Sequence, residues 1–136
     1  MELSDFSTWC WPPSPRTPNI VYIIGFEHTG RFVPIYVGES ERGIARIGEY
    51  ITANFKSPTD FNVGEAARYL QQRGYKVQVK FKEVQNPRKE EQRITQKLQE
   101  LLPNWRKMGY DYQKAKEDEQ RRRVHELMSA FLQALN

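Results

Sequence analysis

The sequence predicts an α+β domain in which a small three-stranded antiparallel sheet is flanked by helices. Three observations carry this prediction: two apolar runs joined by a short glycine turn, a later stretch of alternating apolar residues, and several stretches with apolar residues at helical spacing. A chain of 136 residues has the length of one domain with elaborations. It divides into an N-terminal arm (1–18), a central domain (19–109) and a C-terminal amphipathic helix (110–136).

The arm is expected to be irregular because it holds four prolines and two tryptophans. Each proline removes an amide donor and fixes φ. The arm is either a segment that its tryptophans pin to the domain or a proline-rich segment that binds a partner.

The first two strands form a predicted hairpin. Residues 19–25 are apolar on both faces, which is typical of a central strand, and residues 31–37 return after a turn that ends in glycine. Pro34 interrupts the second strand and indicates an edge position or a bulge.

The third strand has the clearest pattern. Between Tyr75 and Lys82, apolar residues alternate with polar ones, so one face is apolar and the other basic. Lys80 and Lys82 on the basic face either point into solvent or contact a phosphate.

Helical spacing and stop signals place the remaining elements. A proline at the first helical position follows Asn86, and Pro103 stops that helix. The apolar stripe of the last helix either packs back on the domain or forms a dimer contact. We therefore expect helices around Ile44–Phe55, around Glu65–Gln72 with Asn62 as its cap, from Pro87 to about Leu102, and over 110–136.

Composition narrows the function classes. A net charge of +4 suits an anionic partner. The single cysteine, Cys10, excludes an internal disulfide and favours a reducing compartment. The longest apolar run, Ile20–Ile24, is too short to span a bilayer. We therefore expect a soluble cytoplasmic protein that does not enter membranes.

The stretch from Ile35 to Tyr50 reads as a strand end, a glycine turn at Gly38 and a helix. Arg42, Arg46 and Tyr50 recur at four-residue steps on one face of that helix. An arginine and a tyrosine one turn apart, next to a strand-end tyrosine, predict a phosphate site.

Together these elements resemble the GIY-YIG nuclease family over residues 19–104. The first family motif is matched by Val-Tyr-Ile at 21–23 and the second by Tyr-Val-Gly at 36–38. The arginine and tyrosine of the family's first helix are matched by Arg46 and Tyr50. The spacing is especially similar to that of the N-terminal nuclease module of bacterial nucleotide-excision repair.

The resemblance implies a metal-dependent endonuclease that hydrolyses phosphodiester bonds in DNA. One divalent ion, Mg²⁺ or Mn²⁺, would be held by a glutamate on the helix after the third strand. Arg46 would hold the phosphate, and Tyr22 would act as the general base once neighbouring cations lower its pKa from about 10. The site residues implied are Tyr22, Tyr36, Arg46, Tyr50 and Glu91 for catalysis, Glu91 or alternatively Glu90 for the metal, and Gly38, Arg42, Lys80 and Lys82 for the substrate.

Three departures from the family pattern keep other functions open. The first motif has no glycine, Glu39 stands where a lysine is common, and the asparagine expected beyond the final proline is not matched. The alternatives are a GIY-YIG-like module that binds nucleic acid without cutting it, or a protein-assembly unit. An assembly unit would use the C-terminal helix to contact a second copy or another protein.

Overall fold

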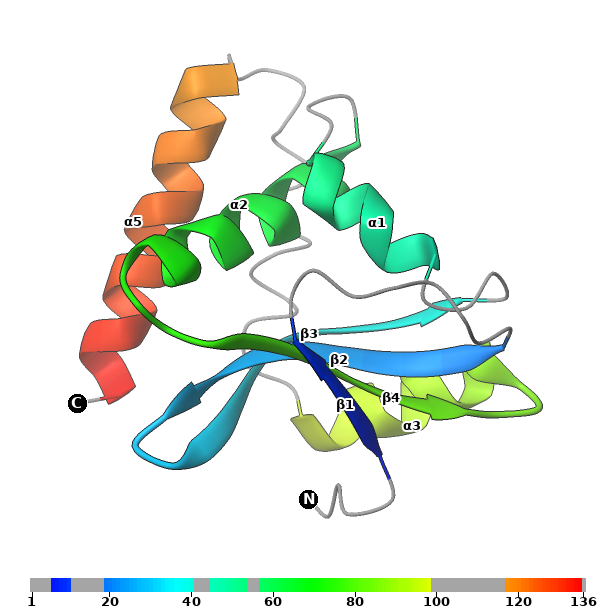
Figure 1. Cartoon of the computed structure of the whole chain (residues 1–136). Helices are drawn as coiled ribbons and strands as arrows, with labels where there is room; N and C mark the ends of the chain where they lie inside the picture. The colour runs from blue at the N-terminus through cyan, green and yellow to red at the C-terminus, as the bar shows by residue number, and fades with distance from the viewer. Residues whose placement is uncertain (1–5, 11–18, 41–44, 54–56, 99–116, 136) are drawn as a thin grey trace.

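A computed structural model describes residues 6–10, 19–40, 45–53, 57–98 and 117–135. Within these residues the fold is α+β, with a four-stranded antiparallel sheet in the order β1-β4-β2-β3 (Figure 1). The strands are β1 (Ser7–Cys10), β2 (Ile20–His28), β3 (Arg31–Ser40) and β4 (Val77–Glu83). The described helices are α1 (Ala45–Thr52), α2 (Pro58–Gln72), α3 (Pro87–Leu98) and α5 (Glu117–Leu135).

The hairpin of β2 and β3 closes through a two-residue turn. Thr29 and Gly30 have φ values of 49° and 78°, the left-handed pair that joins two strands with matching twist. Because the turn is this short, pairing begins at His28 and Arg31, so β2 extends past its expected end. Strand β3 is longer at its other end, where Ser40 pairs with Ile20. The central position of β2 is confirmed, and Pro34 lies on an outer strand of the described sheet beside a register shift.

The prediction of three strands is wrong by one, because β1 lies inside the arm that was expected to be irregular. Ser7–Cys10 pairs antiparallel with β4, and Trp9 stands opposite Val79. The prolines begin only at Pro12, so the amide donors of these four residues remain available for a ladder. Residues 11–18 of the arm lie outside the described residues.

Helix α2 begins earlier than expected. Its first residue is Pro58, with Ser57 at the N-cap position, whereas the sequence predicted a short helix capped by Asn62. A proline at the first position loses no intrahelical hydrogen bond, so Ser57-Pro58 marks a helix start. Asn62 is instead buried in the second turn, where its Oδ1 accepts a hydrogen bond from Gln120 Nε2 at 2.9 Å.

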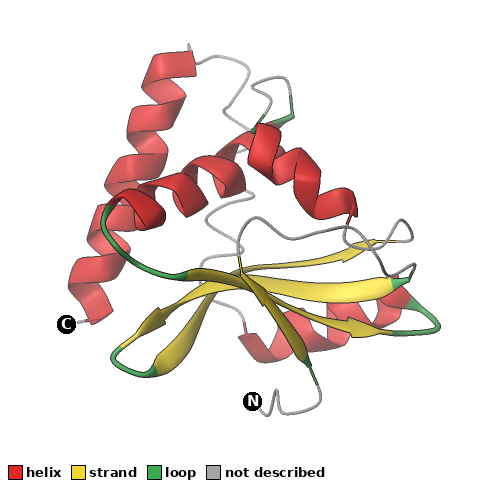
Figure 2. Cartoon of the chain, viewed as in Figure 1, coloured by secondary structure: helices red, strands yellow, loops and turns green. Residues whose placement is uncertain are grey.

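The helices lie in layers on both sides of the sheet. Figures 1 and 2 show α1 and α2 on one side and α3 on the other, and every residue of β2 from Ile20 to Phe26 is buried between them. Helix α3 packs against β3 and β2, and its Ile94 is buried.

Helix α5 packs against α2, so its apolar stripe belongs to the core of the same chain. Val124, Met128 and Leu132 are buried there. None of the described helices combines the length and the apolar character needed to cross a membrane.

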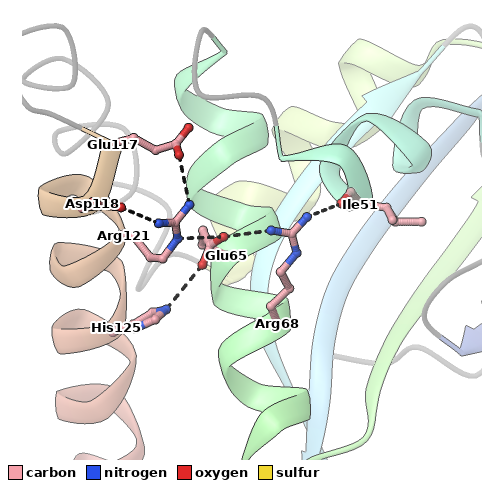
Figure 3. A network of polar contacts seen from close by, with 7 residues as sticks. All are labelled: Ile51, Glu65, Arg68, Glu117, Asp118, Arg121 and His125. Carbon is pink, nitrogen blue, oxygen red and sulfur yellow. Dashed lines mark hydrogen bonds and ion pairs between the residues drawn. The ribbon is translucent and has the colours of Figure 1, made fainter.

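A buried acid on α2 strengthens this contact (Figure 3). The carboxylate of Glu65 lies 3.4 Å from Arg121 Nε and 3.4 Å from His125 Nε2, both on α5. On its own helix it accepts a hydrogen bond from Arg68 Nη1 at 2.9 Å. Arg68 also donates to the carbonyl of Ile51, so the same network reaches α1.

Candidate active site

The site begins with the packing of Tyr22 on Gly38. Tyr22 lies on β2 directly opposite Gly38 on β3. A Cβ at Gly38 would collide with the hydroxyl and the ring of Tyr22. Contrary to the turn expected at this position, Gly38 lies inside β3. Its missing side chain leaves the space that the Tyr22 phenol fills.

Three phenols gather above this point, between the hairpin and α1. The hydroxyls of Tyr22 and Tyr50 are 2.6 Å apart. The ring centroid of Tyr36 lies 6.5 Å from that of Tyr22 and 5.8 Å from that of Tyr50. Tyr22 is 1% exposed and Tyr50 0%, whereas Tyr36 is half-buried, so Tyr36 is the phenol of this cluster that solvent reaches.

Arg46 covers the cluster from α1. Its guanidinium carbon lies 4.4 Å from the ring centroid of Tyr50, one helical turn further on, in a cation–π contact. Its Nη1 donates to Glu49 Oε2 at 3.0 Å, and its Nη2 lies 2.8 Å from Asp60 Oδ1. The Arg46 side chain is 21% exposed, so the guanidinium is the cationic group of the cluster that a solute reaches.

Asp60 is the member of the site that sequence reasoning misses. It lies in the first turn of α2 and is buried. The signal was available, because an acid just after Ser-Pro is typical of a helix start. Once Pro58 is interpreted as a break, however, Asp60 becomes a loop residue with no assigned role.

The electrostatics of the cluster keep the phenols neutral and the guanidinium charged. Burial raises the pKa of Tyr22 well above its ordinary value, and the nearby Tyr36 adds to this. The hydrogen bond to Tyr50 and the charge of Arg46 lower it by less. Burial likewise raises the pKa of Tyr50. For Arg46 burial opposes the charge, but Tyr50, Tyr22 and Asp60 outweigh it and raise the pKa of the guanidinium.

This direction is opposite to the one expected for Tyr22. A general base at neutral pH requires a lowered phenol pKa, and the sequence-based expectation relied on Arg46, the metal ion and Arg42 together to lower it. Arg46 does act in that direction, but the burial of this phenol raises its pKa by more. In this form of the chain Tyr22 is a neutral hydrogen-bonding partner of Tyr50.

The other predicted site residues lie elsewhere. Lys80 and Lys82 pair with Ile23 and Val21, whose side chains alternate with Tyr22, so both lysines are on the opposite face of the sheet. There Lys80 Nζ lies 5.0 Å from the ring centroid of Phe32 and donates a hydrogen bond to Thr8 Oγ1. Lys82 Nζ lies 5.8 Å from the ring centroid of Phe6. Arg42 is outside the described residues.

The predicted metal ligands belong to α3, the helix on the far side of the sheet from α1 (Figure 1). Glu90 and Glu91 are half-buried, and Glu90 forms an ion pair with Arg93 at 2.7 Å. Helix α3 packs on β3, the strand that carries Tyr36 on its other face. No group of three or more metal-binding side chains occurs among the described residues. The ion that the family resemblance implies needs one carboxylate, with water and phosphate as its other ligands.

Comparison with known proteins adds no relative: no protein-family model, no curated protein and no solved structure matches the chain.

Proposed function

We propose that the chain is a GIY-YIG-type endonuclease that hydrolyses phosphodiester bonds in DNA. The observation that carries the proposal is the cluster of Tyr22, Tyr36, Tyr50 and Arg46, which come from two strands and a helix. Each tyrosine alone is explained by packing, but packing does not require a guanidinium on top of them. The net charge of +4 supports an anionic partner.

The residues have distinct roles in this proposal. Arg46 binds the phosphate through its planar fork and offsets the charge that develops in the transition state. Tyr36, the half-buried phenol, orients the phosphate or the attacking water. The hydrogen bond between Tyr22 and Tyr50 holds the Tyr50 ring in place, and the Arg46 guanidinium packs on that ring.

A Mg²⁺ or Mn²⁺ ion would be held by Glu91, or alternatively by Glu90, on α3, the helix that packs against β3 and β2. When bound, such an ion supplies an activated water and neutralises charge on the phosphate.

A second function is a module that binds nucleic acid without cutting it. One observation favours it: Tyr22 is buried against Tyr50 and its pKa is raised, so this phenol is not a general base at neutral pH. In this alternative Arg46 still contacts phosphate, so binding and not cleavage would depend on it.

Plasmid nicking in the presence of Mg²⁺ distinguishes the two functions. We expect the wild-type chain to nick supercoiled DNA and Arg46→Ala to lose about 10²–10³ in rate, the usual cost of removing a group that stabilises transition-state charge. Arg122→Ala is the matched control, because Arg122 is 69% exposed on α5. Nicking that is equal in wild type and Arg46→Ala would refute the nuclease assignment. Binding at low salt that needs Arg46, without any nicking, would establish the second function.

A further inference from the structure

Asp60, on α2, forms an ion pair with the Arg46 guanidinium, the group that would bind a phosphate. Asp60 Oδ1 is 2.8 Å from Arg46 Nη2, and the Asp60 side chain is only 11% exposed. Glu49, the other acid on Arg46, is 37% exposed and lies one turn along the same helix. The charges of these three side chains sum to −1, because one cation faces two anions.

A fixed negative charge beside an anion site penalises ligands according to their own charge. Coulomb repulsion is proportional to the product of the two charges. An internal phosphodiester carries one negative charge, whereas a terminal phosphate monoester carries about −1.5 to −2 at pH 7. Solvent screens the repulsion from Glu49 more than that from the buried Asp60. A terminal phosphate is therefore penalised up to about twice as much, in free energy, as an internal linkage.

We propose that Asp60 is a specificity-determining residue that makes the Arg46 site select internal phosphodiesters over terminal phosphates. This rests on the proposed function and deepens it, since it assigns the site to linkages within a strand and not to strand ends.

Two small probes isolate the effect: thymidylyl-thymidine, which has one diester and no terminal phosphate, and thymidine 5′-monophosphate. Binding is measured by nuclear magnetic resonance titration at pH 8 and low salt, where the monophosphate is a dianion. We expect the wild-type chain to bind the dinucleotide at least as tightly as the monophosphate. Asp60→Asn keeps a hydrogen-bond acceptor for Arg46 but removes the charge.

The charge argument fixes how the two affinities change. If Asp60→Asn tightens dinucleotide binding threefold, monophosphate binding should tighten about ninefold, because twice the energy squares the ratio. Glu49→Gln is the matched control and should change both affinities less. Equal gains for the two probes, or no gain, would overturn the inference, because Asp60 would then only hold Arg46 in place.

Arg46→Ala separates this inference from the proposed function. If Arg46→Ala leaves the binding of both probes unchanged, the proposed site itself is refuted. If it abolishes binding while Asp60→Asn leaves the ratio of the two affinities unchanged, only the role of Asp60 is refuted. Circular dichroism checks that each variant is folded. Should Asp60→Asn not fold, the wild-type chain still decides: tighter binding of the monophosphate than of the dinucleotide overturns the inference.

Discussion

Replacing Gly38 by alanine should destabilise the protein through Tyr22. The new methyl group would meet the hydroxyl and ring of Tyr22, which is buried and bonded to Tyr50. Overpacking a core costs about 1–3 kcal/mol, and a weakened buried hydrogen bond adds about 1 kcal/mol. For a chain of this size, roughly 3–5 °C is lost per kcal/mol. We therefore expect Gly38→Ala to lower the Tm by roughly 6–20 °C.

Gly48→Ala is a control with the opposite expected sign. Gly48 is exposed on α1, and a Cβ there would meet nothing within 4 Å. Alanine is favoured over glycine in a helix by up to about 1 kcal/mol, so the Tm should rise by a few degrees. Thermal unfolding followed by circular dichroism measures both variants. A Gly38→Ala variant as stable as the wild type would refute the packing of Tyr22 on Gly38, and with it the geometry of the site.

Further predictions concern the buried groups and the lysines. Tyr22→Phe should cost about 1–2 kcal/mol in urea unfolding, because the Tyr50 hydroxyl loses its partner while packing is kept; an unchanged stability would contradict the hydrogen bond. Because the pKa of Tyr22 is raised by folding, the unfolded chain loses this proton first. Stability should therefore fall as pH rises above about 10, and less steeply in Tyr22→Phe, as denaturant midpoints at each pH will report. Glu65→Gln should lower the free energy of unfolding by about 1–2 kcal/mol, less than the loss of a fully buried ion pair, because the side chains of Arg68 and Arg121 remain 44% and 34% exposed. The control is Glu126→Gln, whose ion pair with Arg122 is 3.9 Å long, and it should cost under about 0.5 kcal/mol. If the nuclease proposal holds, alanine at both Lys80 and Lys82 should leave plasmid nicking within about twofold of wild type, because these lysines lie across the sheet; a large loss would put DNA on that face.

The parts that the sequence predicts well are those whose signal is local. The sequence Thr29-Gly30 favours a tight turn between two strands. Arg46 and Tyr50 are four residues apart, so any helix places them next to each other on one face. The core face of β4 follows from alternation in the same way.

The parts that it misses depend on distant residues. Strand β1 forms by pairing with the edge of β4, about seventy residues later, and four residues just before a run of prolines carry no periodic signal. The pKa of Tyr22 is raised because α1 and the hairpin enclose it, which no spacing along the chain reveals. The side of the sheet that Lys80 and Lys82 occupy follows from the register with β2, and one residue of slip would reverse it.

Helix α2 serves two neighbours at once. One end presents Asp60 to Arg46, and further along Asn62 and Glu65 hold α5. A truncated protein that ends before α5 would expose this flank of α2 to water and loosen the support of the guanidinium. The boundary drawn at residue 109 from composition is therefore a poor place to cut, and a minimal fragment for biochemical work should extend through Leu135.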